Sequence, residues 1–205
     1  MMNDSLSAAL EADVVSSQAV AVRGARKKFL AMASTYALGV FNDNFFKQAA
    51  CLMALAEGRG KFQGYASALF TVPFILFAAP AGWLSDRFSK RNVVIACKGL
   101  EVLAMLCGAL GIVTGNYSLI LVMVALMGVH STLFSPALNG SIPELYPEAY
   151  VLRANSLLKM ATTAAILLGL FAAGAALGQP GSAAPGVPLG RAIVGVSVLG
   201  VAGLG

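Results

Sequence analysis

The sequence predicts an all-α polytopic membrane protein with a bundle of six transmembrane helices. Composition is the first observation, because 58% of the 205 residues are hydrophobic and only 11% are charged, and the mean hydropathy is +0.79. A soluble domain carries about 25% charged residues, so most of this chain is not built to face water. The second observation is that the apolar stretches are as long as a bilayer core. A segment in lipid has to satisfy its own backbone hydrogen bonds, which requires helices.

Short polar or charged dividers separate the apolar stretches. The predicted spans are 29–56, 63–84, 92–114, 117–137, 156–178 and 189–205. Residues 1–28 are predicted to form a mobile cytoplasmic N-terminal tail, whose first 22 residues lack the apolar core of a secretory signal. Residues 29–205 then form one transmembrane half. The sixth stretch is still apolar at Gly205, so we expect a chain that is truncated in helix 6 and belongs to a longer protein.

The basic residues near the span ends fall mostly on one side of the membrane. That side carries Arg23, Arg26, Lys27, Lys28, Arg87, Lys90, Arg91 and Arg153, and the other carries Arg59, Lys61 and Arg191. The positive-inside rule therefore places the N-terminus, the 86–91 loop and the 139–155 stretch in the cytoplasm, with 57–61 and 179–190 outside. The net charge of +5 is explained by topology, and no nucleic-acid partner is expected.

Two features concern the shape of individual helices. Pro73 and Pro80 lie inside the second span and can bend it. The segment 142–150 mixes prolines, acids and tyrosines, which favours a cytoplasmic loop or an interfacial turn, with Asn155 or Ser156 capping the fifth helix.

The segment 82–91 between the second and third spans reads GWLSDRFSKR. Its pattern, G-x-L-x-D-R-x-x-[KR]-R, resembles the loop between helices 2 and 3 of the major facilitator superfamily of secondary transporters. The resemblance implies that these residues are the N-terminal six-helix half of a carrier of twelve helices, whose missing C-terminal half is a partner. The glycines and alanines of 169–178 are then either ordinary packing residues or a sliding surface between the halves.

The charged loop is predicted to act as a gate latch. Gly82 allows close helix approach, Asp86 can accept hydrogen bonds from a helix N-terminus, and Arg87 and Arg91 can pair with acids such as Glu144. Exposed pairs are worth about 0–1 kcal/mol, so such a latch would bias the gate without locking it. The alternative is that these charges only set topology. The candidate gating residues are Gly82, Asp86, Arg87, Lys90, Arg91 and Glu144.

Polar residues in the middle of the first span mark a candidate substrate site. Burying an Asp at a helix centre costs about 2.5–3.5 kcal/mol on insertion scales, so Asp43 calls for an explanation. Asp43 and Lys47 are four residues apart and share a face. They are either a self-neutralising pair or part of a polar site that faces a water-filled cavity, together with Asn42 or Asn44.

The third and fourth spans add further candidates. Lys98 and Glu101 are three residues apart and able to meet. Glu101 lies about 14 Å into the third span, near the midplane where transporters bind cargo, whereas Lys98 could also snorkel toward the cytoplasm. His130, the single histidine, is either a proton-linked group or is satisfied by a neighbouring backbone. The candidate substrate-binding residues are Asp43, Asn42, Asn44, Lys47, Glu101 and His130.

Two further motifs narrow the resemblance. FNDN at 41–44 and FSPALNGSIPEL at 134–145, together with the charged loop, resemble the lysophospholipid transporter branch of the superfamily. That resemblance implies movement of lysophosphatidylethanolamine and related lysolipids across the bacterial inner membrane for re-acylation. The implied partners are the lipid or small-molecule cargo and the membrane lipids.

Two alternative functions stay open. The chain is also compatible with a proton-coupled carrier of another small solute. Some members of the branch are fused to acyltransferase and acyl-ACP or acyl-CoA synthetase domains, so a larger lipid-acylating enzyme with its catalysis beyond Gly205 is the third reading. The 205 residues contain no H-x-x-x-x-D, Walker or G-x-S-x-G pattern and no metal-ligand cluster, so no catalytic residue, cofactor or metal is expected here.

Overall fold

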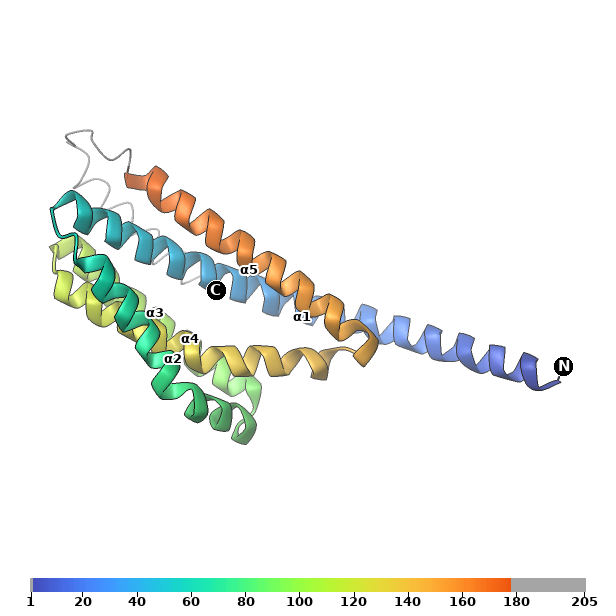
Figure 1. The fold of residues 1–205 in the computed structure, drawn as a ribbon. Coiled ribbons are helices and arrows are strands. Elements are labelled where there is room, and N and C mark those ends of the chain that lie inside the picture. The colour runs from blue at the N-terminus through green and yellow to red at the C-terminus, as the bar shows by residue number, and fades with distance from the viewer. Residues whose placement is uncertain (1, 178–205) are drawn as a thin grey trace.

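The computed structural model describes residues 2–177, which form five α-helices and no strand (Figure 1). The helices are α1 Met2–Ala56, α2 Phe62–Arg87, α3 Lys90–Thr114, α4 Tyr117–Leu145 and α5 Glu148–Leu177. By length and composition, α2, α3, α4 and α5 can each cross a membrane. The all-α membrane class is therefore confirmed, while the predicted sixth span, 189–205, lies outside the described residues.

Helix α1 is much longer than the predicted first span. It begins at Met2, so the expected mobile tail is instead a helix that continues into the 29–56 segment and projects beyond the bundle (Figure 1). The physical reason is local: no Gly or Pro occurs between Met2 and Arg23, and alanines are frequent, so a helix that starts in the bundle can propagate outward. The polar centre of 29–56 makes α1 less hydrophobic than the other four helices.

The connection between α2 and α3 is shorter than the charged loop predicted from the sequence. α2 continues through Arg87 and α3 starts at Lys90, which leaves only Phe88 and Ser89 as the link. The Ser89 hydroxyl caps α3 by accepting a hydrogen bond from the Asn92 backbone N–H at 3.4 Å. Most of the motif's charges therefore stand on helix ends rather than on a flexible turn.

The segment 142–150, predicted as a loop or interfacial turn, contains only a short turn. α4 continues to Leu145 and α5 starts at Glu148, so only Tyr146 and Pro147 join them. Pro136 and Pro143 lie inside α4, because each proline removes a single backbone donor and a long helix can absorb that loss. The predicted cap at residue 155 or 156 is interior to α5, where the Ser156 hydroxyl donates to the Leu152 carbonyl at 2.9 Å.

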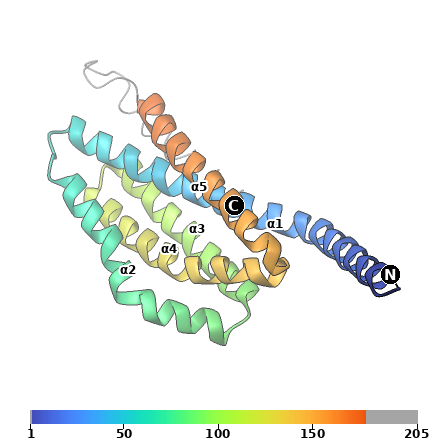
Figure 2. The ribbon, with the colours of Figure 1, turned by 45° about the vertical axis from the view of Figure 1, so that its right-hand side comes forward.

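The other two predicted dividers are confirmed. Residues 57–61 join α1 to α2, and Gly115 and Asn116 join α3 to α4. Gly115 has φ +68, a left-handed conformation that suits glycine at a helix C-cap. Pro73 and Pro80 do lie inside α2, and Figure 2 shows that this helix is bent.

Packing divides the bundle into two apolar clusters. α1 lies along α5, and α4 packs against both α2 and α3 (Figures 1 and 2). One cluster includes Phe46, Met105 and Met123, and the other includes Phe29 and Leu138. Large apolar side chains also cover the outside of the bundle, with exposed fractions of 76% for Ile75, 79% for Leu152 and 76% for Phe171. Such a surface is suited to contact with lipid.

Gly169 sets the distance between α5 and α1. A Cβ atom at this position would lie 2.7 Å from the Phe41 carbonyl oxygen and 3.1 Å from the Phe45 nitrogen, both of which are backbone atoms. We therefore expect Gly169→Ala to lower the stability of the full-length protein by about 1–3 kcal/mol, because α5 has to move away. Thermal unfolding in detergent measures the effect.

Gly174→Ala is the matched control for that prediction. It lies on the same helix, but a Cβ there would meet nothing within 4 Å among the described residues. Alanine is the better helix former by about 1 kcal/mol, so Gly174→Ala should be neutral or stabilising. Equal melting temperatures for the two variants would show that the close α1–α5 contact is absent in the membrane protein.

Candidate functional site

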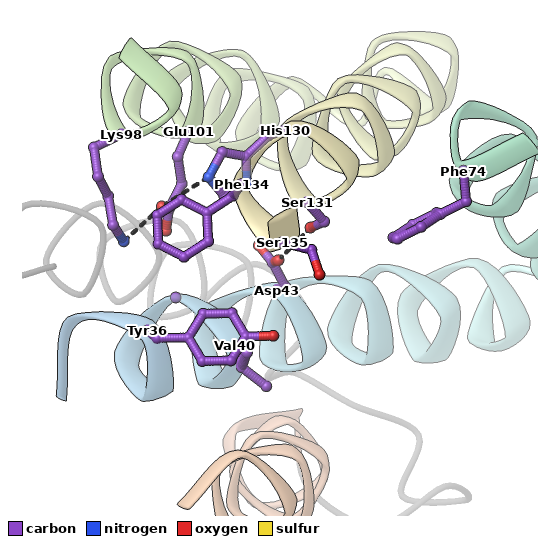
Figure 3. Close-up of a pocket in the computed structure, with 11 residues that line it drawn as sticks. Tyr36, Val40, Asp43, Phe74, Lys98, Glu101, His130, Ser131, Phe134 and Ser135 are labelled. Atoms are coloured by element: carbon purple, nitrogen blue, oxygen red, sulfur yellow. Dashed lines mark hydrogen bonds and ion pairs between the residues drawn. The ribbon is translucent and has the colours of Figure 1, made fainter. Parts of the chain in front are cut away.

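A cavity of about 110 Å³, lined by both apolar and ionisable side chains, lies in the middle of the bundle. Four helices, α1 to α4, contribute its walls (Figure 3). Phe74, Glu101 and Ser131 each lie within one residue of the midpoint of their own helix, which places the cavity at the depth where transporters bind cargo. The lining residues are Tyr36, Gly39, Val40, Asp43, Phe74, Lys98, Glu101, His130, Ser131, Phe134 and Ser135.

Three ionisable groups from α3 and α4 meet on one side of the cavity. Lys98 Nζ donates to Glu101 Oε2 at 2.7 Å, and His130 Nε2 lies 3.4 Å from the same oxygen, within ion-pair distance but without hydrogen-bond geometry (Figure 3). Glu101 is only 2% exposed, so its charge needs these partners. Its second oxygen, Oε1, has no hydrogen-bond partner among the residues that the structure describes and is available to a bound cation or donor.

Gly39 lets the α3 pair approach helix α1. A Cβ atom at Gly39 would lie 3.2 Å from Lys98 Nζ and 3.4 Å from Glu101 Oε1. Lys98 Nζ also lies 3.5 Å from the Thr35 carbonyl oxygen, so it reaches across to α1 instead of extending toward the helix end. Of the two possibilities for Lys98, the pair with Glu101 is therefore confirmed and snorkelling toward the cytoplasm is wrong.

Asp43 approaches the cavity from α1. The Ser131 hydroxyl donates to Asp43 Oδ2 at 3.2 Å (Figure 3), and Oδ1 has no partner in the described part of the chain. Lys47 does not pair with it. The Lys47 ammonium lies 4.3 Å from the centroid of the Phe70 ring instead, which is a cation–π contact with α2. The intrahelical Asp43–Lys47 pair considered from the sequence is thus absent, and Asp43 faces the cavity.

The remaining sequence candidates divide between the cavity and its surroundings. Neither Asn42 nor Asn44 lines it. Asn42 is fully buried, and its amide has no hydrogen-bond partner among the described residues, whereas Asn44 Nδ2 donates to the Val40 carbonyl at 2.8 Å. His130 does line it, and no backbone group satisfies its ring nitrogens. The site thus brings Asp43, Glu101 and His130 together and leaves out both Asn residues and Lys47.

Sequence reasoning missed several lining residues. Tyr36 lies two helical turns before Asp43 on the same face, and its ring stacks on Phe134 with centroids 5.6 Å apart and an interplanar angle of 14°. Ser131 adjoins His130, and Phe134 and Ser135 belong to a motif that the sequence had singled out. The helical spacing from Asp43 was the available signal for Tyr36, while Ser131 carries no signal of its own.

The predicted latch residues are arranged differently from the expectation. Lys90, rather than Arg87 or Arg91, is the partner of Glu144, and Lys90 Nζ also donates to the Gly140 carbonyl at 2.8 Å. The side chains of Arg87 and Arg91 form no ion pair or hydrogen bond within residues 2–177, and the same holds for Asp86. Gly82 makes no close helix contact there either, since a Cβ would meet nothing within 4 Å.

A bundle of membrane-length helices with charges of both signs buried at their midpoints is the architecture of a secondary transporter. The chain belongs to the Major Facilitator Superfamily, whose family model matches residues 28–204. Among curated proteins it is similar to the lysophospholipid transporter LplT of Salmonella newport (strain SL254), of Salmonella agona (strain SL483) and of Salmonella typhi. Each is 33% identical over 138 residues, which is 67% of this chain and 33% of the relative. The chain thus spans about a third of the length of these relatives. No solved structure matches it.

Proposed function

We propose that this chain is the N-terminal half of a lysophospholipid transporter of the bacterial inner membrane, which moves lysophosphatidylethanolamine across the bilayer by alternating access. The observation that carries the proposal is the meeting of Asp43, Glu101 and Lys98 in one buried cavity at the helix midpoints. A zwitterionic headgroup presents an ammonium and a phosphate. The free carboxylate oxygens of Asp43 and Glu101 suit the ammonium, and Lys98 suits the phosphate. The names of the Salmonella relatives support the same cargo class.

The size of the cavity fits half of a binding site. Its volume of about 110 Å³ falls below the roughly 300–1,000 Å³ of complete small-molecule pockets, so it has room for a headgroup but not for a whole lysolipid. In the proposed carrier, a second six-helix half closes the site from the other side, and the acyl chain lies outside the cavity. Fused acyltransferase or synthetase domains are not needed for this activity.

Uptake of labelled lysophosphatidylethanolamine by spheroplasts tests the function directly. Spheroplasts that express the full-length protein carrying these residues should accumulate the lysolipid several-fold faster than spheroplasts with an empty vector. Unlabelled lysophosphatidylethanolamine should compete, and sugars or amino acids should not. Uptake at the vector rate, with the protein verified in the membrane, would reject the lysolipid cargo and favour a carrier of another small solute.

The proposed orientation has its own test. With the N-terminus in the cytoplasm, a cysteine placed at position 89 is inside and one at position 59 is outside. Each cysteine is introduced into a variant that has no other cysteine. In intact cells, an impermeant maleimide should therefore label the Arg59→Cys protein and should not label the Ser89→Cys protein. Both positions are exposed and lie in helix connections, so accessibility is matched. The opposite labelling pattern would invert the topology.

A further inference from the structure

A second cavity, of about 470 Å³, lies between the outer parts of α1 and α5. Its walls come from the start of the predicted first span and from the α4–α5 connection, at the end of the bundle that carries the α2–α3 link. It shares no lining residue with the midplane cavity, so it is separate from the proposed cargo site.

The lining of this cavity is basic on one part and apolar on another. Arg26 and Arg153 bring guanidinium groups from two helices, and no acidic residue lines the cavity. Neither arginine forms an ion pair within the described part of the chain. Tyr146 and Tyr150 add phenolic hydroxyls, which are hydrogen-bond donors, and neither hydroxyl has a partner among residues 2–177.

The apolar part of the lining leads to the lipid-facing surface. Phe29 packs edge-on against the Tyr146 ring, with centroids 5.4 Å apart and an interplanar angle of 72°, which holds the tyrosine in place. Leu30 and Leu157 also line the cavity and are 55% and 49% exposed. A ligand here would therefore have an anionic group beside the arginines and an apolar chain along the leucines.

We propose that this cavity binds one anionic phospholipid from the leaflet next to the α4–α5 connection. Arg26 and Arg153 bind the headgroup phosphate, since a guanidinium can donate two parallel hydrogen bonds to phosphate oxygens. The hydroxyl of Tyr150 donates to the same headgroup, and an acyl chain lies along Leu30 and Leu157. Basic pockets between transmembrane helices bind anionic headgroups in this way. The site would make the α1–α5 contact sensitive to lipid composition.

Native mass spectrometry of the full-length protein in a neutral detergent tests this site. A neutral micelle has no charged bilayer surface, so a lipid that stays bound is held by the protein itself. The wild-type protein should retain one phosphatidylglycerol in preference to phosphatidylcholine. Arg26→Gln combined with Arg153→Gln should weaken phosphatidylglycerol binding roughly thirtyfold. The control, Lys27→Gln with Lys28→Gln, removes the same charge from exposed neighbours outside the cavity and should retain the lipid.

Two further arms decide the chemistry of the site. Arg26→Lys with Arg153→Lys keeps the charge but loses the two-pronged hydrogen bonding, so binding should weaken less than in the glutamine pair. Millimolar inorganic phosphate should not displace the lipid, because only the lipid contacts Leu30 and Leu157. The proposal would be overturned if the wild-type protein bound the two lipids equally or if the Arg26→Gln, Arg153→Gln variant kept the lipid fully. It would also be overturned if the Lys27→Gln, Lys28→Gln control lost the lipid to the same extent, or if phosphate displaced it. None of these outcomes depends on the transported cargo.

Discussion

Asp43→Asn is expected to reduce lysophosphatidylethanolamine uptake on the order of 10- to 100-fold while the protein still reaches the membrane. The substitution keeps the shape of the side chain, and the amide oxygen can still accept the hydrogen bond from Ser131. It removes the ionisable carboxyl group whose Oδ1 has no partner among the described residues and where the cargo ammonium is proposed to bind. A hydrogen bond to a charged group is worth about 1.5–3 kcal/mol, which corresponds to that range of rates.

Lys47→Leu is the matched control for this prediction. It also neutralises one charge on α1, one helical turn away, but the Lys47 ammonium contacts Phe70 and does not line the cavity. We expect it to retain most of the wild-type uptake rate. Spheroplast uptake, normalised to the amount of protein in the membrane, measures both variants. Wild-type uptake by the Asp43→Asn variant would show that the cavity does not take part in transport. Equal losses of uptake in the two variants would show that the cargo site is not limited to the cavity.

Glu101→Leu is expected to destabilise the protein strongly. It leaves the half-buried Lys98 ammonium, beside Phe134 and the Thr35 carbonyl, without its carboxylate partner. Removing one member of a buried ion pair costs about 3–5 kcal/mol, a large share of the roughly 5–15 kcal/mol that stabilises a folded protein. Thermal unfolding and gel filtration of the purified full-length protein should show an early transition or aggregation.

The double variant Lys98→Leu with Glu101→Leu separates stability from function. Replacing both members of a buried pair by apolar residues is often neutral or stabilising, so the double variant should recover a melting temperature close to that of wild type. Its lysolipid uptake should stay low, because the cavity has lost the groups proposed for the headgroup. If the double variant recovered both folding and uptake, the Lys98–Glu101 pair would have a structural role only. If the single Glu101→Leu variant were as stable as wild type, the contact between Lys98 and Glu101 would be contradicted.

The sequence was sufficient for the properties that depend on composition and local pattern. Apolar stretches of bilayer length predicted the helices α2 to α5, because a span requires continuous hydrophobicity whatever its neighbours are. The polar dividers at 57–61 and around Gly115 were also found from sequence, since the residues that end these helices act locally. Asp43 and Glu101 were recognised because a charge inside a span is costly enough to need a reason.

Helix ends and side-chain partners depended on the tertiary structure. Proline and charge patterns suggested a loop at 86–91 and a loop or turn at 142–150, but α2 stays helical through Arg87 and α4 through Leu145. Spacing paired Asp43 with Lys47, whereas the fold pairs Asp43 with Ser131, which is 88 residues away. Sequence spacing gives only the neighbours on one helix. Which polar groups meet in the cavity is decided by how four helices rotate and approach each other, and that depends on small residues such as Gly39 and on the apolar clusters above and below the site.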